Sequence, residues 1–259
     1  MKFETIDRCI CCGGDVLKRP ATIDPFVAHR LGYQGKRIPC HTLHCQTCGI
    51  MFLDIRYTDE QMTQLYMNYR DEEYVSVRET YQPKYRSLNK WFDERVPYMD
   101  AIEAMLAPHL TFPVSILDYG GDTGHNTPFA GRRSLLHIYD IGNNPVIPGA
   151  LWVDRNTASL FRYDLIVCAN VLEHVPSPED VLRDILTLMD EPTVLFIEVP
   201  FDGGNKDYWH EHINYFTGLG IETLLSRCGL KIIEVTEVKI NTPLGFICQF
   251  LIACRKDYP

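Results

Sequence analysis

The sequence predicts an α/β protein in which a doubly wound, mostly parallel sheet of seven strands follows a small N-terminal zinc-binding module. Three observations lead to this prediction. Short apolar runs alternate with helical patterns from about residue 113 onward, polar residues follow the first five of these runs, and two cysteine pairs lie near the N-terminus. Strands that alternate with helices form parallel sheets with both faces covered. We therefore divide the chain into a zinc-binding module (1–57), a helical linker or cover (58–112) and an α/β domain (113–259).

The composition is that of an ordinary globular protein. The 259 residues are 46% hydrophobic and 23% charged, with a formal net charge of −9. Nucleic-acid binding requires clustered Lys and Arg to neutralise phosphates, so this balance predicts no nucleic-acid partner. The chain has neither an apolar secretion signal nor a run of about 18 apolar residues, which predicts no membrane span. Ten cysteines without a signal indicate a reducing compartment, and we expect a cytoplasmic protein.

Two cysteine knuckles carry the zinc prediction. Each reads C-x-x-C-G, with Cys9 and Cys12 in the first and Cys45 and Cys48 in the second. The two-residue gap lets both sulfurs of a knuckle face one ion, and the glycine allows a tight turn. Four thiolates form the closed tetrahedral set of a structural zinc site, which leaves no position for a catalytic water. The pattern leaves open whether one of four neighbours replaces a member of this set: Cys11, Cys40, His41 or His44.

The segment after the second knuckle is expected to be helical. Residues 58–61 (Thr-Asp-Glu-Gln) form a capping-box pattern, which predicts a short helix through Leu65 and Tyr66. A longer helical pattern runs from about Ser87 to Leu110, with a kink expected at Pro97. We interpret this segment as a cover that leads into the α/β domain.

Apolar runs predict the seven strands of the α/β domain: Val114–Leu117, Leu135–Tyr139, Leu151–Val153, Leu165–Ala169, Val194–Val199, Lys231–Val235 and Phe246–Ala253. Helix signals lie between several of them. Ser177 as the cap and Pro178 in the first turn predict one helix. A second helical pattern begins at Thr217 and ends before Gly229.

A polar residue lies at or directly after the end of each of the first five predicted strands: Asp118, Asp140, Asp154, Asn170 and Glu198. In an open α/β sheet, ligands bind in the crevice beyond the carboxyl ends of the strands. A single acid after a strand is explained by capping of the next helix, but five polar groups in register predict one polar rim. We expect a polar cofactor to bind at this rim.

The first strand continues into Asp118-Tyr119-Gly120-Gly121-Asp122-Thr123-Gly124. Glycines let the backbone approach a ligand closely and turn into a helix. The dinucleotide fingerprint G-x-G-x-x-G does not fit, because Asp122 stands at its second glycine, and no phosphate-binding G-x-x-x-x-G-K-[ST] loop occurs. An acidic turn would repel a pyrophosphate, whereas it suits a cofactor with a cationic sulfonium and an amino-acid tail.

At these residues the chain resembles the class I S-adenosylmethionine-dependent methyltransferases, which have a Rossmann-like fold. Their first motif, [DE]-x-G-x-G-x-G, is matched by Asp118, Gly120 and Gly124, while Asp122 replaces the middle glycine. The segment 163–175, which contains Asn170, resembles the family's fourth-strand motif. The resemblance implies S-adenosylmethionine as the cofactor. It also implies that Asp140 holds the ribose hydroxyls and that Asp154 lies near the adenine amine.

A second motif narrows the resemblance. Trp209-His210-Glu211-His212-Ile213-Asn214-Tyr215-Phe216, together with the knuckles, resembles C-methyltransferases of nucleotide-linked keto-sugars, whose motif reads Y-H-E-H-x-x-Y-F. The resemblance implies that Glu211 and His212 are catalytic, with His212 as the base, and it assigns an active-site tyrosine to the region of Tyr74. Those enzymes carry a further C-terminal domain that this chain lacks, which indicates a different or smaller substrate.

The chemistry of methyl transfer also favours a histidine. An alcohol or carbon acid must lose a proton to attack a sulfonium methyl group, and an imidazole that titrates near neutral pH can take it. We therefore expect O- or C-methylation of a small polar metabolite, such as a sugar, with a purely structural zinc.

Other interpretations remain open for the motifs and for the chain. The H-E-H run would also fit a helix cap or a zinc-binding pair, and Glu173-His174 would fit a structural role. The chain itself would also fit an RNA or protein methyltransferase, a non-catalytic binding protein or a nicotinamide-dependent reductase.

Overall fold

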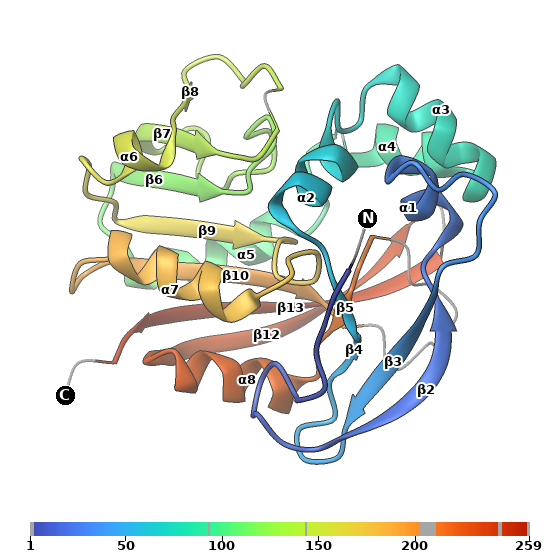
Figure 1. The fold of residues 1–259 in the computed structure, drawn as a ribbon. Helices are drawn as coiled ribbons and strands as arrows, with labels where there is room; N and C mark the ends of the chain where they lie inside the picture. The colour runs from blue at the N-terminus through green and yellow to red at the C-terminus, as the bar shows by residue number, and fades with distance from the viewer. Residues whose placement is uncertain (1–2, 93, 143, 202–210, 243–244, 258–259) are drawn as a thin grey trace.

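The computed structural model describes residues 3–92, 94–142, 144–201, 211–242 and 245–257. Its largest element is a seven-stranded sheet with the strand order β12-β13-β10-β9-β6-β7-β8 (Figure 1). The strands are β6 (Val114–Tyr119), β7 (Arg133–Tyr139), β8 (Leu151–Trp152), β9 (Leu165–Ala169), β10 (Val194–Pro200), β12 (Leu230–Thr242) and β13 (Gly245–Lys256). The predicted α/β class and all seven predicted strands are confirmed, although the sixth is much longer than its apolar run.

The five strands from β10 to β8 are parallel, and β13 alone runs against its neighbours. Because β6 lies between β7 and β9 while the chain passes from β6 first to β7, the strand order reverses at β6. Open sheets bind ligands at such a reversal, beyond the carboxyl ends of the strands. The topology therefore directs attention to the residues that follow β6, β7 and β9.

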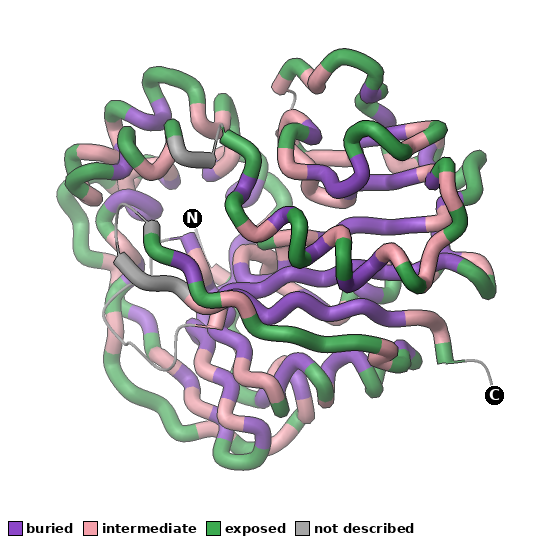
Figure 2. Tube along the Cα trace, turned by 180° about the vertical axis from the view of Figure 1, so that it is seen from behind, coloured by how far each residue is buried: buried purple, intermediate pink, exposed green. Residues whose placement is uncertain are grey.

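Apolar side chains of the strands alternate between two buried clusters. Ile116 of β6 packs with α5 (Met99–Leu106), and Leu117 packs with α7 (Pro178–Leu188) and α8 (Gly218–Arg227). This alternation follows from the two-residue period of a strand. Both faces of the sheet are covered, and buried positions run along its strands (Figure 2).

The N-terminal region forms a second sheet that the α/β domain completes. Its antiparallel strands, in sheet order, are β11 (Asn214–Tyr215), β4 (Met51–Leu53), β3 (Pro39–Cys45) and β2 (Val16–Thr22). A separate pair joins β1 (Glu4–Thr5) to β5 (Ile55–Arg56), and the short helix α1 (Pro25–Arg30) follows β2. Since β11 follows β10 in the chain, the N-terminal sheet is tied directly to the segment that contains Glu211 and His212.

Three short helices cover the carboxyl ends of the parallel strands (Figure 1). They are α2 (Asp59–Tyr66), α3 (Glu72–Tyr81) and α4 (Tyr85–Phe92). The predicted capping box at the start of α2 is confirmed, because Thr58 and Gln61 exchange backbone-to-side-chain hydrogen bonds. The long helix expected from Ser87 to Leu110 is instead α4, α5 and a 3-10 turn, η1 (Ala107–His109). Pro97 lies in the break between α4 and α5, where a proline ends a helix by lacking an N–H donor.

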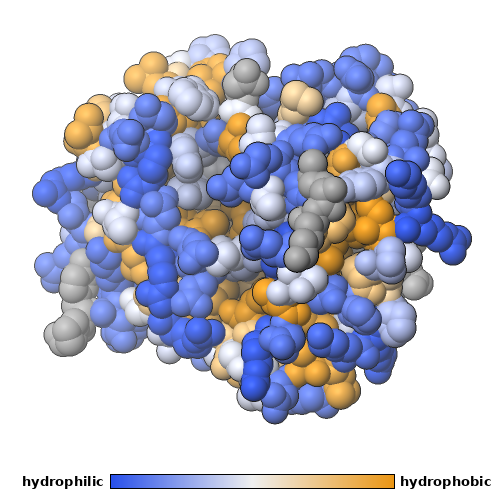
Figure 3. Space-filling model, in the orientation of Figure 1, coloured by the Kyte–Doolittle hydropathy of each residue, from blue (hydrophilic) through white to orange (hydrophobic). Residues whose placement is uncertain are grey.

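Polar side chains cover most of the face seen in Figure 3, with hydrophobic ones gathered in patches toward its middle and lower part. No helix among the described residues is long and apolar enough to cross a membrane.

Candidate active site

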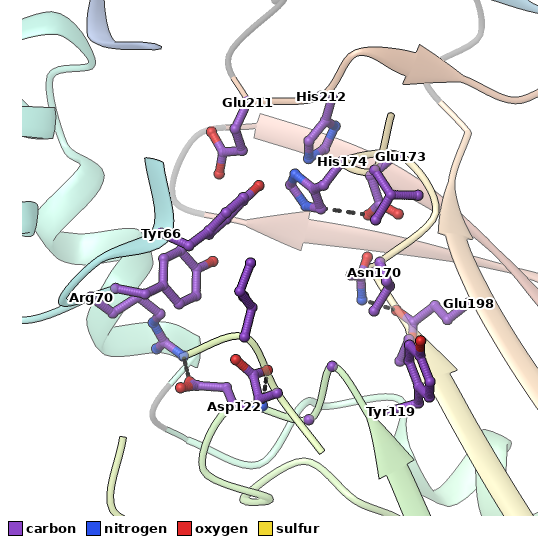
Figure 4. A pocket seen from close by; sticks show the side chains of 18 of the residues that line it. Tyr66, Arg70, Tyr119, Asp122, Asn170, Glu173, His174, Glu198, Glu211 and His212 are labelled. Carbon is purple, nitrogen blue, oxygen red and sulfur yellow. Dashed lines mark hydrogen bonds and ion pairs between the residues drawn. The ribbon is translucent and has the colours of Figure 1, made fainter. Parts of the chain in front are cut away.

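A cavity of about 1950 Å³ opens between the carboxyl ends of the parallel strands and the cover helices. Four of the five predicted rim residues line it: Asp118, Asp140, Asn170 and Glu198. Glu211 and His212 line the same cavity (Figure 4). The structure therefore brings the residues expected to bind a cofactor and those expected to perform the chemistry into one space.

The glycine loop lies at one end of this cavity. Gly120 has a positive φ of 81°, and a Cβ there would lie 2.4 Å from Val171 Cγ2. Gly124 also has a positive φ, 77°, and a Cβ there would lie 2.7 Å from Ile138 Cδ1. Both positions require glycine because the left-handed backbone and the close neighbours exclude a side chain. Gly120 lines the cavity, whereas Gly124 shapes the turn from behind it.

Asp118 is a buried carboxyl group at the end of β6. Thr127 Oγ1 donates a 2.5 Å hydrogen bond to its Oδ2. Burial raises the pKa of Asp118 from its usual 3.8 to about 7, the Thr127 hydroxyl lowers it, and the charges of Asp140 and Asp122 raise it. The charge of this group therefore changes near neutral pH.

Asp140 ends β7 and is held in place by the glycine loop. Its Oδ2 accepts a 2.9 Å hydrogen bond from the Asp122 N–H, and its Oδ1 accepts a 2.6 Å bond from the Gly142 N–H. Each carboxylate oxygen has two lone pairs, so both can accept a further hydrogen bond from a ligand. This is the geometry needed to bind two adjacent hydroxyl groups.

Asp154 lies elsewhere. It is exposed, it caps α6 (Arg155–Ala158) by accepting a 2.7 Å hydrogen bond from the Thr157 N–H, and it is not among the residues that line the cavity. The structure does not bring this residue to the other rim carboxylates. Helix capping accounts for an aspartate at this position.

Asn170 and Glu198 join the ends of β9 and β10 to the cover. Glu198 Oε1 accepts hydrogen bonds from Tyr98 Oη (2.6 Å) and Asn170 Nδ2 (3.1 Å). Gln249 Nε2 donates to Asn170 Oδ1 at 3.2 Å. Burial raises the pKa of Glu198. Asn170 has a positive φ of 53°, which asparagine tolerates better than most residues.

Asp122, at the position of the family's middle glycine, bonds to the cover. Arg70 Nη1 donates to Asp122 Oδ2 at 3.1 Å (Figure 4). Asn144 Nδ2 donates to both Asp122 Oδ1 (2.7 Å) and the Tyr69 carbonyl oxygen (3.1 Å). Arg70 is anchored in turn by Asn89, whose side-chain and main-chain oxygens it bonds at 2.7 and 3.0 Å. These contacts, which we call the cover clasp, tie the segment after α2 to the glycine loop.

At the other end of the cavity Glu211 forms a buried ion pair with Arg78. Arg78 Nη1 lies 2.5 Å from Glu211 Oε1, and both side chains are almost fully buried. Burial opposes ionisation of Glu211, but the charge of Arg78 outweighs it and holds the pKa of this carboxyl far below its usual range. Glu211 is therefore a fixed anion and cannot serve as a proton donor near neutral pH.

His212 lies beside His174, with ring centroids 4.6 Å apart in an edge-to-face arrangement. Burial lowers the pKa of His174.

Tyr74, the predicted catalytic tyrosine, is 0% exposed and does not line the cavity. Its hydroxyl accepts a 3.3 Å hydrogen bond from Arg78, so it lies behind the Arg78–Glu211 pair. Trp209 and His210 of the predicted motif lie outside the described residues.

The buried polar atoms at this end of the cavity that have no hydrogen-bond partner among the described residues include Tyr66 Oη and Glu211 Oε2. Both residues line the cavity. The Tyr66 ring packs edge-to-face against His174 with centroids 5.9 Å apart. Buried polar atoms are nearly always paired, so an isolated donor and acceptor facing one cavity point to a polar ligand.

The four predicted zinc ligands also come together. The sulfurs of Cys9, Cys12, Cys45 and Cys48 all lie within 4.8 Å of one another. Cys9 Sγ is 3.5 Å from Cys48 Sγ, and Cys12 Sγ is 3.4 Å from Cys45 Sγ. These separations suit four thiolates around one tetrahedral ion with metal–sulfur bonds of about 2.3 Å. The four alternatives considered from the sequence are not part of this group: Cys11, Cys40, His41 and His44.

Sequence patterns missed several residues of the cavity: Tyr66, Arg70, Arg78 and Tyr98. They also missed Asn144, which belongs to the cover clasp. Each lies on the cover or in a loop. They meet the rim only through contacts distant in sequence, and no local motif marks them. The crowding of tyrosines between α2 and α4 was the one available signal, and it does not distinguish Tyr66 at the cavity from Tyr74 in the core.

Comparisons with known proteins agree with this fold. Residues 86–235, more than half of the chain, match the profile of a family described as "Methyltransferase domain". The Burkholderia thailandensis 1,6-didemethyltoxoflavin-N1-methyltransferase, solved with 1,6-didemethyltoxoflavin and S-adenosylhomocysteine, is 16% identical with a TM-score of 0.56. The similarity covers 82% of this chain and 97% of that one.

A second similar structure is the Synechocystis magnesium protoporphyrin IX methyltransferase with bound S-adenosylhomocysteine. It is 15% identical with a TM-score of 0.50, over 76% of this chain and all of that chain (100%). At these identities both likenesses show a shared fold. No curated protein sequence matches the chain.

Proposed function

We propose a function from the premise that the chain belongs to the methyltransferase-domain family. The protein transfers a methyl group from S-adenosylmethionine to an oxygen or carbon atom of its substrate. The substrate is a small polar metabolite with sugar-like hydroxyl groups. One observation carries the proposal. A single cavity holds Asp118 and Asp140 near the glycine loop and Glu211, His212 and the Tyr66 hydroxyl at its other end. A cofactor and a polar acceptor therefore have separate sets of partners in one space.

The glycine-loop end has the donors and acceptors that the cofactor needs. Asp140 is held by two backbone N–H groups and retains lone pairs for the two ribose hydroxyls. Asp118, when ionised, would attract the cationic end of the cofactor, and Gly120 presents only backbone to the cavity there. When bound, S-adenosylmethionine supplies an electrophilic methyl group on a positively charged sulfur.

The acceptor end has groups for binding and for deprotonation. Glu211 Oε2 and Tyr66 Oη supply an unpaired acceptor and donor, which we assign to hydroxyl or carbonyl groups of the substrate. The Arg78 pair fixes the orientation of Glu211. His212 would take the proton that the attacking oxygen or carbon loses, since an imidazole is suited to this role near neutral pH.

We assign the four-cysteine cluster a structural zinc ion with no part in the transfer. The cluster is closed, and three of its cysteines are buried. Four thiolates leave no coordination position for a substrate. The zinc would instead hold the N-terminal sheet, to which β11 and hence the Glu211–His212 segment is attached.

The test is calorimetry with S-adenosylmethionine followed by transfer of a labelled methyl group to a panel of sugars, nucleotide sugars, RNA and peptides. We expect cofactor binding and labelling within the sugar class. His212→Ala should retain cofactor affinity and slow turnover about 10²- to 10⁴-fold, the contribution of a general base. His109→Ala is the matched control, because His109 pairs with Glu234 and does not line the cavity.

Each alternative has its own signature. Absence of cofactor binding would identify a non-catalytic scaffold. Labelling of RNA or peptide alone would identify an RNA or protein methyltransferase. Full activity of His212→Ala would remove that residue from the mechanism.

A further inference from the structure

A second group of potential metal ligands lies in the cavity, away from the cysteines. One ligand atom each from Glu173, His174 and His212 lies within 4.8 Å of the others. Glu173 Oε1 is 3.7 Å from His174 Nε2. In Figure 4 the two imidazoles and the carboxylate lie next to one another above Asn170. Two ligands on one metal ion with bonds of about 2.1 Å are roughly 3 to 3.5 Å apart, so small side-chain shifts would complete the set.

The backbone holds the two segments of this group together. The Ile213 and Asn214 N–H groups both donate to the Glu173 carbonyl oxygen, at 2.9 and 3.0 Å. Asn214 Nδ2 donates to the Leu172 and Val175 carbonyl oxygens, each at 2.9 Å. The loop after β9 is thus fastened to the residues after His212, and the two histidines are adjacent before any ligand binds. Such preorganisation lowers the cost of assembling a metal site.

Burial and charge favour a cation here. The Glu173 side chain is 1% exposed and that of His174 is 14% exposed, and a buried carboxylate is costly unless positive charge compensates it. A metal ion bound between the three side chains would place positive charge beside this buried carboxylate.

We propose that Glu173, His174 and His212 bind a divalent transition-metal ion at the acceptor end of the cavity. Two imidazoles and one carboxylate suit zinc, manganese or ferrous iron, and three protein ligands leave coordination positions open toward the cavity. All three residues line that cavity, so the open positions face the space assigned to the acceptor. Binding of the ion does not depend on the proposed methyl transfer.

The role of the ion rests on the proposed function. It would hold oxygens of the acceptor and lower the pKa of the acceptor hydroxyl or carbon acid, as a Lewis acid does. The proton lost by the acceptor would pass to solvent, and no other bond would change before methyl transfer. With the ion bound, His212 is a ligand and the proton passes to solvent; without the ion, His212 is the base proposed above.

In the experiment, the full chain with zinc in its cysteine site is titrated with Mn²⁺. Electron paramagnetic resonance reports the concentration of free Mn²⁺. Manganese prefers nitrogen and oxygen ligands and does not compete for thiolates. We expect one bound Mn²⁺ per chain. His212→Ala and Glu173→Gln should weaken it at least about 10-fold, the smallest loss typical even for groups that only orient ligands. His125→Ala, which alters another histidine of the cavity, should bind Mn²⁺ as the wild type does.

Calorimetry with S-adenosylmethionine on the same variants checks that they fold, because the cofactor end of the cavity is unchanged in them. Absence of Mn²⁺ binding in the wild type would overturn the proposal. Equal binding by the wild type and by a correctly folded His212→Ala variant would overturn it as well. Both results are independent of whether any acceptor is methylated.

Discussion

At the scale of single residues, Asp140 and Asp154 follow neighbouring parallel strands but have opposite surroundings. Asp140 lines the cavity, and Asp154 caps a helix outside it. Asp140→Ala should weaken S-adenosylmethionine binding by about 1.5 to 3 kcal/mol, the range for hydrogen bonds to a charged group. That loss corresponds to roughly 10- to 150-fold in the dissociation constant measured by calorimetry. Asp154→Ala is the matched control and should bind normally. Equal effects of the two substitutions would contradict the assignment of Asp140.

Asp118 should make the affinity for S-adenosylmethionine depend on pH. Its pKa is raised, mainly by burial, from 3.8 to about 7, so the folded protein holds a proton there that the unfolded chain has lost. The free energy of unfolding contributed by this group therefore falls as pH rises from about 4 to 7. Binding of the cationic cofactor has the opposite trend, because it favours the ionised carboxylate. We expect the affinity for S-adenosylmethionine to rise between pH 6 and pH 8.

The control for this pH dependence is Asp118→Asn, which keeps the shape of the side chain and removes its titration. Calorimetry at four or five pH values should give a nearly flat profile for this variant. A wild-type profile that is equally flat would show that Asp118 does not sense the charge of the cofactor.

The rim was predictable from the sequence because position along a strand determines position in space. The carboxyl ends of parallel strands meet at one edge, so Asp118, Asp140, Asn170 and Glu198 could be placed together without a structure. Asp154 follows the same rule, yet β8 ends the sheet far from the strand reversal at β6, where helix capping explains the residue. The rule identifies candidates, and the tertiary position decides which of them reach the cavity.

At the scale of secondary-structure elements, the cover clasp is the feature that distinguishes this glycine loop. Asp122 bonds Arg70 and Asn144, and Asn144 also bonds the Tyr69 carbonyl oxygen. Arg70→Ala should release the segment after α2 from the loop. We expect faster cofactor dissociation, by roughly 5- to 30-fold if the partly buried contacts are worth about 1 to 2 kcal/mol, together with faster amide hydrogen exchange around residues 66–70.

Arg86→Ala is the control for the clasp. Arg86 belongs to the same cover, but it is exposed and pairs with Glu72 and Glu79, and surface ion pairs contribute little. Stopped-flow measurement of cofactor release should separate the two arginines. If both variants release the cofactor at the wild-type rate, the clasp does not retain it.

Local signals predicted elements well where a specific cap was present. The capping box at Thr58 and the Ser177 and Thr217 caps all begin helices in the structure. The pattern from Ser87 to Leu110 failed as a single helix because an apolar period of 3.6 can continue across a break. Only the proline marked the interruption, and a proline by itself does not distinguish a kink from an end.

At the scale of the whole molecule, the cysteine knuckles and the cavity are connected through β11. Tyr215 of β11 pairs with Met51 of β4, and the Thr217 hydroxyl donates a 2.6 Å hydrogen bond to the Cys48 carbonyl oxygen. The same segment bonds to Glu173 through the Ile213 and Asn214 N–H groups. The second knuckle and the acceptor end of the cavity are therefore separated by one short, hydrogen-bonded segment. The sequence could not predict this connection, because the two-residue strand β11 has no pattern of its own.

Removal of the proposed zinc ion should therefore reduce catalysis more than cofactor binding. Cys45→Ser breaks the four-thiolate set, and metal binding to such sites is coupled to folding. We expect loss of the zinc, a lower midpoint of thermal unfolding, and turnover reduced by at least about 10-fold as the Glu211–His212 segment loses its anchor. Asp118 lies on β6 and Asp140 directly follows β7, and neither strand belongs to the small sheet that contains Cys45. The affinity for S-adenosylmethionine should consequently change far less than turnover.

Cys40→Ser is the matched control for this prediction, since Cys40 is buried in the same strand, β3, but lies outside the four-cysteine group. Zinc content by atomic absorption, unfolding by calorimetry, cofactor affinity and turnover would be measured on both variants. A Cys45→Ser protein that loses zinc yet turns over normally would show that the N-terminal sheet holds its shape without the ion. Equal loss of cofactor affinity and turnover would instead indicate that the N-terminal region and the α/β domain unfold as one unit. Only a selective loss of turnover supports the path from the knuckle through β11 to His212.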